Sequence, residues 1–130
     1  MTSRSEISVS APNSLLLVTT SEQPEIPASM DARLIASTST TVAVGTLSES
    51  DGQTVVRLTD EMPDQESEGV QLVYEGRLEG GLGFVRVINV RGEAYLEWGD
   101  VLESFRLRIW ANDPSEPDLV VVEIRRDELS

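Results

Sequence analysis

Carboxylates are the most abundant ionisable side chains in this chain. Its 130 residues include 23 Asp and Glu and 10 Arg, with no Lys, His or Cys, and the formal net charge is −13. The missing residue types exclude a histidine general base, a thiol nucleophile, a disulfide, an ordinary zinc site and Schiff-base chemistry. After these exclusions, three roles remain open to the carboxylates: calcium binding, acid–base catalysis in pairs, and attraction of a basic partner.

Three carboxylates fall within the six residues of Asp113-Pro114-Ser115-Glu116-Pro117-Asp118. Calcium takes about six to eight oxygen ligands from flexible loops, but this spacing matches no EF-hand loop. The two prolines favour a rigid turn. We expect no metal and no cofactor here, and calcium binding is the alternative that a calorimetric titration with Ca²⁺ decides.

Catalysis by paired carboxylates is the least favoured role. A glycosidase places two carboxylates about 5–5.5 or 6.5–9.5 Å apart across a sugar cleft, and no Asp or Glu pair stands out in this sequence. Gly80, Gly81 and Gly83 are not a nucleotide-binding fingerprint, because the segment after them is typical of a strand and not of a helix. We therefore expect a protein that is not an enzyme, with a carboxylate-dependent hydrolase as the last alternative.

The acidic residues concentrate in two segments. Seven lie from Glu49 to Glu68, against the single base Arg57, and five lie from Asp100 to Asp118. Such charge indicates a solvated surface, an adaptation to salt, or a surface that attracts a basic protein by electrostatic steering. On the third interpretation, the predicted partner-binding residues are Asp60, Glu61, Asp64, Glu66, Glu68, Asp113, Glu116, Asp118 and Trp110.

The net charge and the apolar runs limit the kinds of partner. A strongly acidic chain is a poor direct binder of nucleic acid, whose affinity for proteins comes mainly from cations that neutralise phosphates. The longest aliphatic runs, Leu15–Val18 and Leu119–Val122, are far too short to span a bilayer. No secretory signal is visible near Met1. The sequence RDEL near the C-terminus resembles a retrieval signal, but such signals are read at the free C-terminus and Ser130 follows this one. We expect a cytoplasmic protein with no membrane partner.

Short apolar segments with a period of two predict strands along the whole chain. A single helical turn is expected at Pro63–Glu66, and no segment is typical of a helix of three turns. The expected strands are Ile7–Val9, Ser14–Thr20, Ala32–Ser37, Thr41–Leu47, Thr54–Thr59, Val70–Leu78, Phe84–Val90, Ala94–Trp98, Ser104–Trp110 and Leu119–Arg125.

Turn residues between these segments predict hairpins. The clearest hairpin is expected around Glu79–Gly83, where the glycines supply positive φ. The three expected turns are Ser48–Gly52 between Thr41–Leu47 and Thr54–Thr59, Glu79–Gly83 between Val70–Leu78 and Phe84–Val90, and Arg91–Glu93 before Ala94–Trp98.

Two segments predict which side chains face the core. The Ser104–Trp110 segment places Phe105, Leu107 and Ile109 on one side and Arg106, Arg108 and Trp110 on the other. A Trp beside arginines is either an interface hot spot or a half-buried ring covered by a stacked guanidinium. The Leu119–Ile124 segment is apolar on both faces at its start. As an unpaired edge it would support the alternative function, a structural or assembly subunit that forms homo-oligomers.

About 130 residues is the usual size of one domain. Residues 1–130 are therefore expected to form a single all-β domain, with 1–5 as a flexible N-terminus. Several short strands at regular spacing predict an antiparallel β-sandwich of about eight to ten strands.

The order of these segments resembles the ComJ-like family, inhibitors of the DNA-entry nuclease of competence systems. At the level of residues, the segment SFRLRIWAND is similar to a PYRLRVWARG strand of small acidic bacterial proteins. The resemblance implies an intracellular β-sandwich that binds and blocks a nuclease or toxin, and it carries over no catalytic residue. The segments that carry it are Ile7–Val9, Leu15–Leu17, Thr41–Thr59, Val70–Val90, Ala94–Trp98 and Phe105–Ala111.

Overall fold

The computed structural model describes residues 4–21, 34–48, 50–60, 69–79, 84–99, 104–113 and 116–126. Several sequence predictions fall outside these residues. They are the helical turn at Pro63–Glu66, the glycines Gly80, Gly81 and Gly83, and the acidic residues Glu61, Asp64, Glu66 and Glu68.

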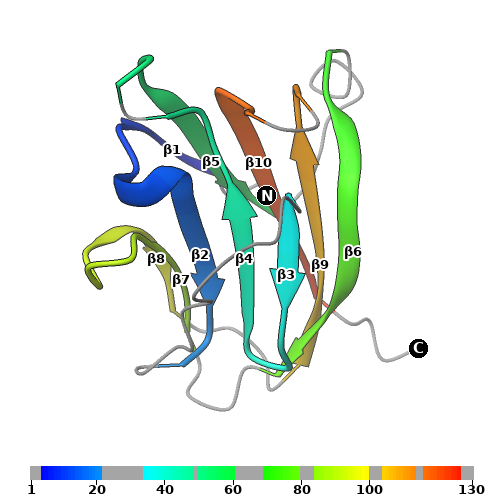
Figure 1. The fold of residues 1–130 in the computed structure, drawn as a ribbon. Helices are drawn as coiled ribbons and strands as arrows, with labels where there is room; N and C mark the ends of the chain where they lie inside the picture. Colours follow the sequence, from blue (N-terminus) through cyan, green and yellow to red (C-terminus); the bar gives the residue numbers. More distant parts are fainter. Residues whose placement is uncertain are drawn as a thin grey trace.

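The described strands form two five-stranded sheets packed face to face, which confirms the expected β-sandwich (Figure 1). Sheet A has the order β1-β5-β10-β9-β6 and sheet B the order β3-β4-β2-β7-β8. All strand pairs are antiparallel except β5 with β10, which run parallel. The strands are β1 (Arg4–Val9), β2 (Leu15–Thr19), β3 (Ile35–Ser37), β4 (Thr41–Gly45), β5 (Thr54–Thr59), β6 (Gln71–Glu79), β7 (Val85–Ile88), β8 (Ala94–Trp98), β9 (Ser104–Ala111) and β10 (Leu119–Arg126).

Helical structure in the described residues is limited to the 3-10 turn η1 (Pro12–Ser14). Within this part of the chain, no helix has the length and apolar character needed to cross a membrane. Strand β1 begins at Arg4, inside the segment 1–5 that was expected to be flexible. Arg4 pairs with Thr59 and Ser5 with Leu58.

Two of the three expected hairpins are wrong. Strands β4 and β5 belong to different sheets, and so do β6 and β7, so both connections cross the sandwich instead of joining paired neighbours. Turn residues such as Asp51-Gly52 indicate that the chain reverses. They do not determine whether the next strand pairs with the previous one or crosses to the other sheet. The third turn does join paired strands, because β7 pairs with β8 across Arg91–Glu93.

Strand β10 lies inside sheet A, between β5 and β9, so the expectation of an unpaired edge at Leu119–Ile124 is wrong. The apolar character of both faces reflects burial of both faces, which is independent of how a strand is paired at its sides. Val120 and Val121, on opposite faces, are both fully buried. In the described part of the chain the sheet edges are β1 and β6 in sheet A, and β3 and β8 in sheet B.

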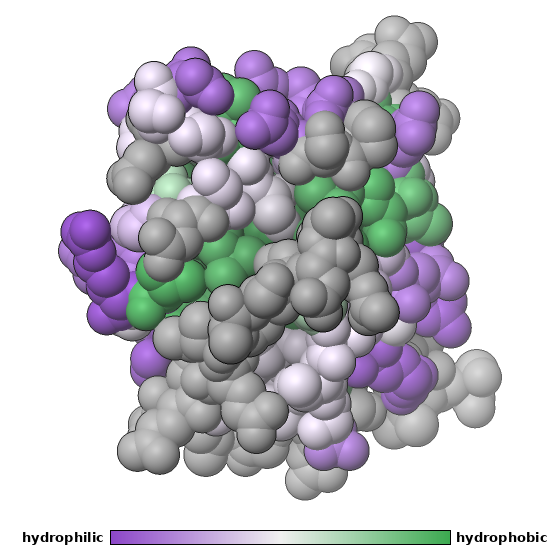
Figure 2. Space-filling view, viewed as in Figure 1, coloured by the Kyte–Doolittle hydropathy of each residue, from purple (hydrophilic) through white to green (hydrophobic). Residues whose placement is uncertain are grey.

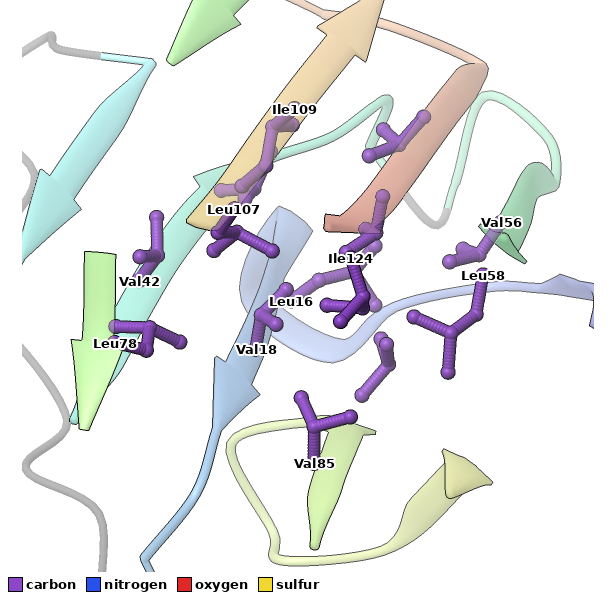
Figure 3. Close-up of a cluster of buried hydrophobic side chains, with 14 of the residues drawn as sticks. Leu16, Val18, Val42, Val56, Leu58, Leu78, Val85, Leu107, Ile109 and Ile124 are labelled. Atoms are coloured by element: carbon purple, nitrogen blue, oxygen red, sulfur yellow. The ribbon is translucent and has the colours of Figure 1, made fainter. Parts of the chain in front are cut away.

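The main core lies between the sheets and is built from alternate residues of each strand (Figure 3). Leu16 and Val18 of β2 and Val42 of β4 point inward from sheet B, and Leu107 and Ile109 of β9 point inward from sheet A. A smaller buried cluster on the opposite face of sheet B consists of Leu15, Leu17, Ala43 and Ile88. Figure 2 views the molecule over β2, β3 and β4 and shows hydrophilic side chains around the periphery.

Asn89 holds the β7–β8 turn through both ends of its buried side chain. Its Oδ1 accepts hydrogen bonds from the N–H groups of Arg91 and Glu93, at 2.9 and 3.1 Å. Its Nδ2 donates to Glu93 Oε1 at 3.1 Å and to the Tyr95 hydroxyl at 2.9 Å. Gly92 adopts a φ of 83° in the same turn, a conformation that glycine accepts without strain.

We expect Asn89→Ala to lower the free energy of unfolding by about 1–3 kcal/mol, because the substitution leaves buried polar groups without partners. Urea denaturation followed by circular dichroism measures the change. Arg91→Ala is the matched control, since that side chain is exposed in the same turn and its loss should leave the midpoint unchanged. Equal midpoints for Asn89→Ala and the wild type would contradict the structural role.

Candidate functional site

Strand β9 sets which residues face outward from sheet A. Phe105, Leu107 and Ile109 are fully buried between the sheets, as their spacing predicts. Arg106, Arg108 and Trp110 therefore lie on the opposite side, which we call the outer face of sheet A.

The pairing register places each of these three residues opposite one residue of β6 and one residue of β10. Trp110 lies opposite Leu72 and Val121, which forms an apolar row. The next row has mixed charge and a third row is entirely basic. Arg108 lies opposite Glu75 and Glu123, and Arg106 lies opposite Arg77 and Arg125. We call Arg77, Arg106 and Arg125 the arginine row.

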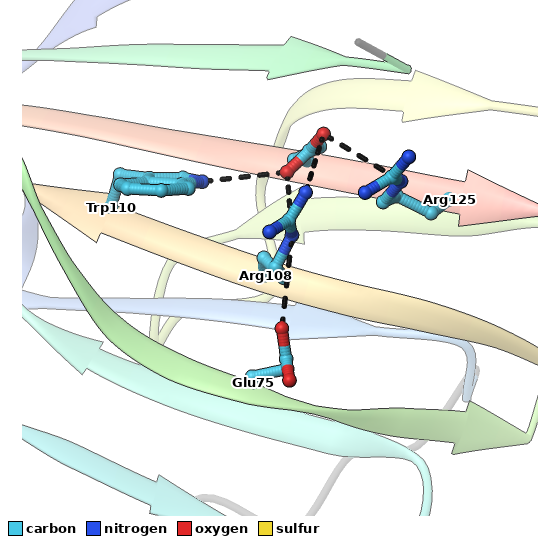
Figure 4. Close-up of polar contacts among 5 residues, drawn as sticks. Glu75, Arg108, Trp110 and Arg125 are labelled. Atoms are coloured by element: carbon cyan, nitrogen blue, oxygen red, sulfur yellow. Dashed lines mark hydrogen bonds and ion pairs between the residues drawn. The ribbon is translucent and has the colours of Figure 1, made fainter. Parts of the chain in front are cut away.

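A buried carboxylate organises the mixed-charge row (Figure 4). The Glu123 side chain is 3% exposed and lies 2.9 Å (Oε1) from Nε of Arg108. Arg108 Nη2 donates to Glu123 Oε2 at 3.4 Å, and Trp110 Nε1 donates to Oε1 at 3.5 Å. Arg125 Nε lies 3.9 Å from Oε2. Three cationic or N–H groups thus compensate the burial of one charge, without which that burial would be costly.

Arg108 links this carboxylate to the surface. Its Nε also lies 3.8 Å from Glu75 Oε2, on the exposed side of the row. The buried Nε has no hydrogen-bond partner among the described residues, so its contact with Glu123 is an ion pair without an aligned N–H. The guanidinium carbon of Arg108 lies 5.7 Å from the centroid of the Trp110 ring, within the range of a cation–π contact.

Trp110 is half-buried, and the guanidinium of Arg108 lies over its ring, which is compatible with the second of the two interpretations of the sequence. Its neighbour Leu72 is the large hydrophobic side chain that the described residues leave most open, at 44% exposed. The apolar row thus combines a covered aromatic ring with an accessible aliphatic side chain on edge strand β6.

The acidic segment between β9 and β10 behaves as a turn held by its own polar groups. The Glu116 N–H donates to Asp113 Oδ2 at 2.8 Å. Asn112 Oδ1 accepts from the N–H groups of Asp118 and Leu119, at 3.1 and 3.2 Å. Glu116 and Asp118 are exposed, and Asp113 is half-buried. Among the described residues, no three His, Cys, Asp or Glu side chains are placed to hold a metal ion.

Those predicted acidic site residues that the structure describes do not meet in one patch. Asp113, Glu116 and Asp118 precede Leu119, which pairs with Val55 near the start of β5. Asp60 follows the end of the same strand, about 16–20 Å away at the usual rise per residue. Trp110 lies on the outer face of sheet A, toward the end occupied by the β9–β10 turn.

The arginine row is the feature that sequence reasoning missed. The alternation of Arg106 and Arg108 in β9 was a usable signal for the outward side of that strand. The neighbours of β9 are β6 and β10, and only their register places Arg77 and Arg125 opposite Arg106.

These observations define a two-sheet β-sandwich with a charged outer face, and the chain has the ComJ-like fold. Its structure matches the crystal structure of ComJ from Bacillus subtilis, an inhibitor of the DNA-degrading activity of NucA, with a TM-score of 0.67 and 11% identity. The match covers 98% of this chain and 99% of that one. No family model and no curated protein sequence matches the chain.

Proposed function

We propose that this protein is a non-enzymatic inhibitor or immunity protein that binds a nuclease or another basic toxin. The observation that carries the proposal is the fold shared with ComJ over nearly the full length of both chains. ComJ inhibits a DNA-degrading activity. The match extends over the whole sandwich and is not confined to one motif. An inhibitor role is therefore the best-supported function for this chain.

The charge of the chain supports a basic partner. A nuclease holds its substrate through cations that neutralise phosphates, and a protein with net charge −13 is attracted to such a surface over long distances. Glu116 and Asp118 are exposed at the β9–β10 turn, next to the outer face of sheet A. We propose that this turn, with Trp110, contacts the partner and that Asp60 and the acidic residues up to Glu68 add to the attraction.

Affinity capture from an extract of the native cell tests the proposal. The tagged full-length protein should retain a basic nuclease or toxin, identified by mass spectrometry, and the complex should dissociate as salt rises because the attraction is screened. The activity of the captured protein should be lower in the complex than after salt release. Capture of no such partner, or activity that is equal in both states, would contradict the proposal.

A triple variant with Asp113→Asn, Glu116→Gln and Asp118→Asn tests the proposed contact residues. We expect it to bind the partner about tenfold more weakly, since each neutralised carboxylate at an interface rim removes steering and contact energy. The matched control neutralises three exposed carboxylates away from this turn, Glu79→Gln, Glu93→Gln and Glu97→Gln, and it should bind as the wild type does. Unchanged binding of the triple variant would exclude this turn from the interface.

We also propose a cytoplasmic site of action in a bacterium, as for an inhibitor that protects the cell producing the nuclease. Homo-oligomers formed through sheet edges are the alternative, and light scattering separates the two. A monomer is expected for the inhibitor.

A further inference from the structure

The Asp51-Gly52 pair is a turn motif that the proposed function leaves unused. Both residues are exposed in the connection that leads from β4 in sheet B to β5 in sheet A. The Asp51 N–H donates to the Ser48 carbonyl oxygen at 2.9 Å, which fixes the reversal of the chain. Gly52 has a φ of 143°, in a region that residues with a side chain rarely adopt. The turn therefore places an exposed carboxylate next to the peptide nitrogen of a residue that has no side chain.

Asp51 is also the one aspartate in the sequence that a glycine follows. A side chain on the following residue hinders attack of its peptide nitrogen on the aspartate carboxyl. Asp118 gives the comparison within the same molecule, because it is exposed in the β9–β10 turn but precedes Leu119. The Leu119 N–H also donates to Asn112 Oδ1 at 3.2 Å, which holds that nitrogen in place. Only the Asp51 site combines an exposed carboxyl group with an unhindered neighbour.

The chemistry open to this pair is ring closure followed by hydrolysis. The Gly52 peptide nitrogen attacks Cγ of the protonated Asp51 carboxyl group, the N–Cγ bond forms, and the N–H proton leaves with the carboxyl hydroxyl as water. The five-membered cyclic imide then takes up one water. Addition of this water at Cγ restores aspartate, whereas addition at the main-chain carbonyl carbon of Asp51 breaks the original peptide bond and leaves isoaspartate. One water is released and one is consumed, so the isomerisation needs no oxidant or reductant.

The connection that carries Asp51 is anchored on both sides to the β9–β10 turn. Before Asp51, the Leu47 N–H donates to the Pro117 carbonyl oxygen at 2.9 Å. After it, the Val55 N–H donates to the Asp118 carbonyl oxygen at 2.8 Å. Isoaspartate carries the main chain through Cβ and Cγ, so it adds one carbon to the main chain between these two anchors.

From these observations we propose that Asp51-Gly52 is a modification site at which Asp51 converts to isoaspartate, and that the conversion loosens the β4–β5 connection from the β9–β10 turn. The Leu47 side chain fills the inner side of the connection, since a Cβ on Gly52 would lie 3.4 Å from Leu47 Cδ2. The longer main chain therefore displaces the anchors. The carboxylate is retained, so the net charge stays at −13 and the change is one of geometry.

Peptide mapping of the full-length protein, incubated for weeks at neutral pH and physiological temperature, tests the site. Trypsin releases residues 34–57, in which Asp51 is the single aspartate. We expect a second form of this peptide, of unchanged mass, that grows with incubation time. The new form should resist an endoproteinase that cleaves before aspartate and should accept a methyl group from an isoaspartyl methyltransferase. The peptide of residues 109–125, which contains Asp118, is the internal control and should remain one species.

Two substitutions at Asp51 set the expected order of rates. Asp51→Glu should abolish the second form, because its ring closure needs a six-membered imide, which forms far more slowly. Asp51→Asn should form isoaspartate faster than the wild type, because its side-chain amide is never ionised and ammonia leaves in place of water. No second form in the wild type, or one that grows equally in Asp51→Glu, would overturn the site.

Amide hydrogen exchange of the isomerised fraction tests the coupling to the β9–β10 turn without any partner. The Leu47 and Val55 N–H groups should exchange faster than in the unaltered protein, because their acceptors lie on that turn. The Gly92 N–H, which donates to the Asn89 carbonyl oxygen at 3.0 Å in the β7–β8 turn, is the control and should exchange at the same rate. Unchanged exchange at Leu47 and Val55, or an equal rise at Gly92, would overturn the coupling.

The consequence for binding rests on the proposed function, in which the β9–β10 turn contacts the partner. The isomerised fraction should bind the captured nuclease more weakly than Asp51→Glu incubated alongside it, and equal binding would overturn this link. Failure to capture a nuclease leaves the peptide-mapping and exchange results standing. Absence of isoaspartate leaves inhibition to be measured separately, so the two proposals fail independently.

Discussion

Glu123→Ala should lower the free energy of unfolding by about 2–4 kcal/mol, because removing one partner of a buried ion pair leaves the other charge uncompensated. Glu123 is 3% exposed and faces Arg108, Trp110 and Arg125. Arg108 is 22% exposed, so water reaches part of the remaining charge. For that reason we place the loss below the largest values known for fully buried pairs.

Urea denaturation of Glu123→Ala and Glu75→Ala measures the difference. Glu75 contacts the same arginine, but its side chain is 50% exposed, so its removal should cost no more than about 0.5 kcal/mol. A double variant, Glu123→Met with Arg108→Met, should recover most of the lost stability, since apolar residues replace both charges. Similar losses for the two single variants would show that Glu123 is no more important than a surface carboxylate.

Phe105→Ala should have the largest effect on stability, about 3–5 kcal/mol, because it removes the transfer free energy of the ring and leaves a cavity. Phe105 is the largest fully buried side chain of the described residues. It lies opposite Leu78 of β6 and Arg126 of β10 in the sheet, so its ring helps hold the edge strand β6 to the core.

The measurement is again the free energy of unfolding in urea, with Leu72→Ala as the control. Leu72 lies on the outer face of the same edge strand and is 44% exposed, so its truncation should cost less than about 1 kcal/mol. We expect Phe105→Ala to be folded at low temperature and to unfold at a much lower urea concentration. A loss in Phe105→Ala that does not exceed the loss in Leu72→Ala would contradict the placement of the core.

The inward and outward sides of the strands could be predicted from the sequence because side-chain direction alternates along a strand. Phe105, Leu107 and Ile109 are buried as their spacing predicts, and Arg106 faces out. The β7–β8 hairpin was also predictable, since its turn is short and contains Gly92 in the positive-φ region.

The pairing of the strands outside the β7–β8 hairpin could not be predicted, for a physical reason. A reversal of the chain looks the same in sequence whether the following strand returns to its own sheet or crosses the sandwich, as β5 and β7 do. Strand β10 was mistaken for an edge because two-sided apolar character marks burial on both faces and says nothing about hydrogen-bonding neighbours. The arginine row depends on that pairing, so it became visible only with the register of β6, β9 and β10.

In the described residues, negative and positive side chains are concentrated in two different regions. Exposed carboxylates lie at the β9–β10 turn, and the arginine row lies on the outer face of sheet A, with Trp110 and the buried Glu123 between them along the strands. Burial of Glu123 ties the conformation of Arg108 to the core, so the face is held in place before any partner binds. A surface ordered in advance loses less entropy when it binds.

The most direct test of the proposed inhibitor function is a titration of the purified protein into a DNA-degradation assay of the nuclease that it captures. We expect the rate of DNA cleavage to fall in proportion to added protein and to approach zero near one equivalent. Arg91→Glu should give the same titration curve. Cleavage that continues at the uninhibited rate when the nuclease is saturated with this protein would contradict the account.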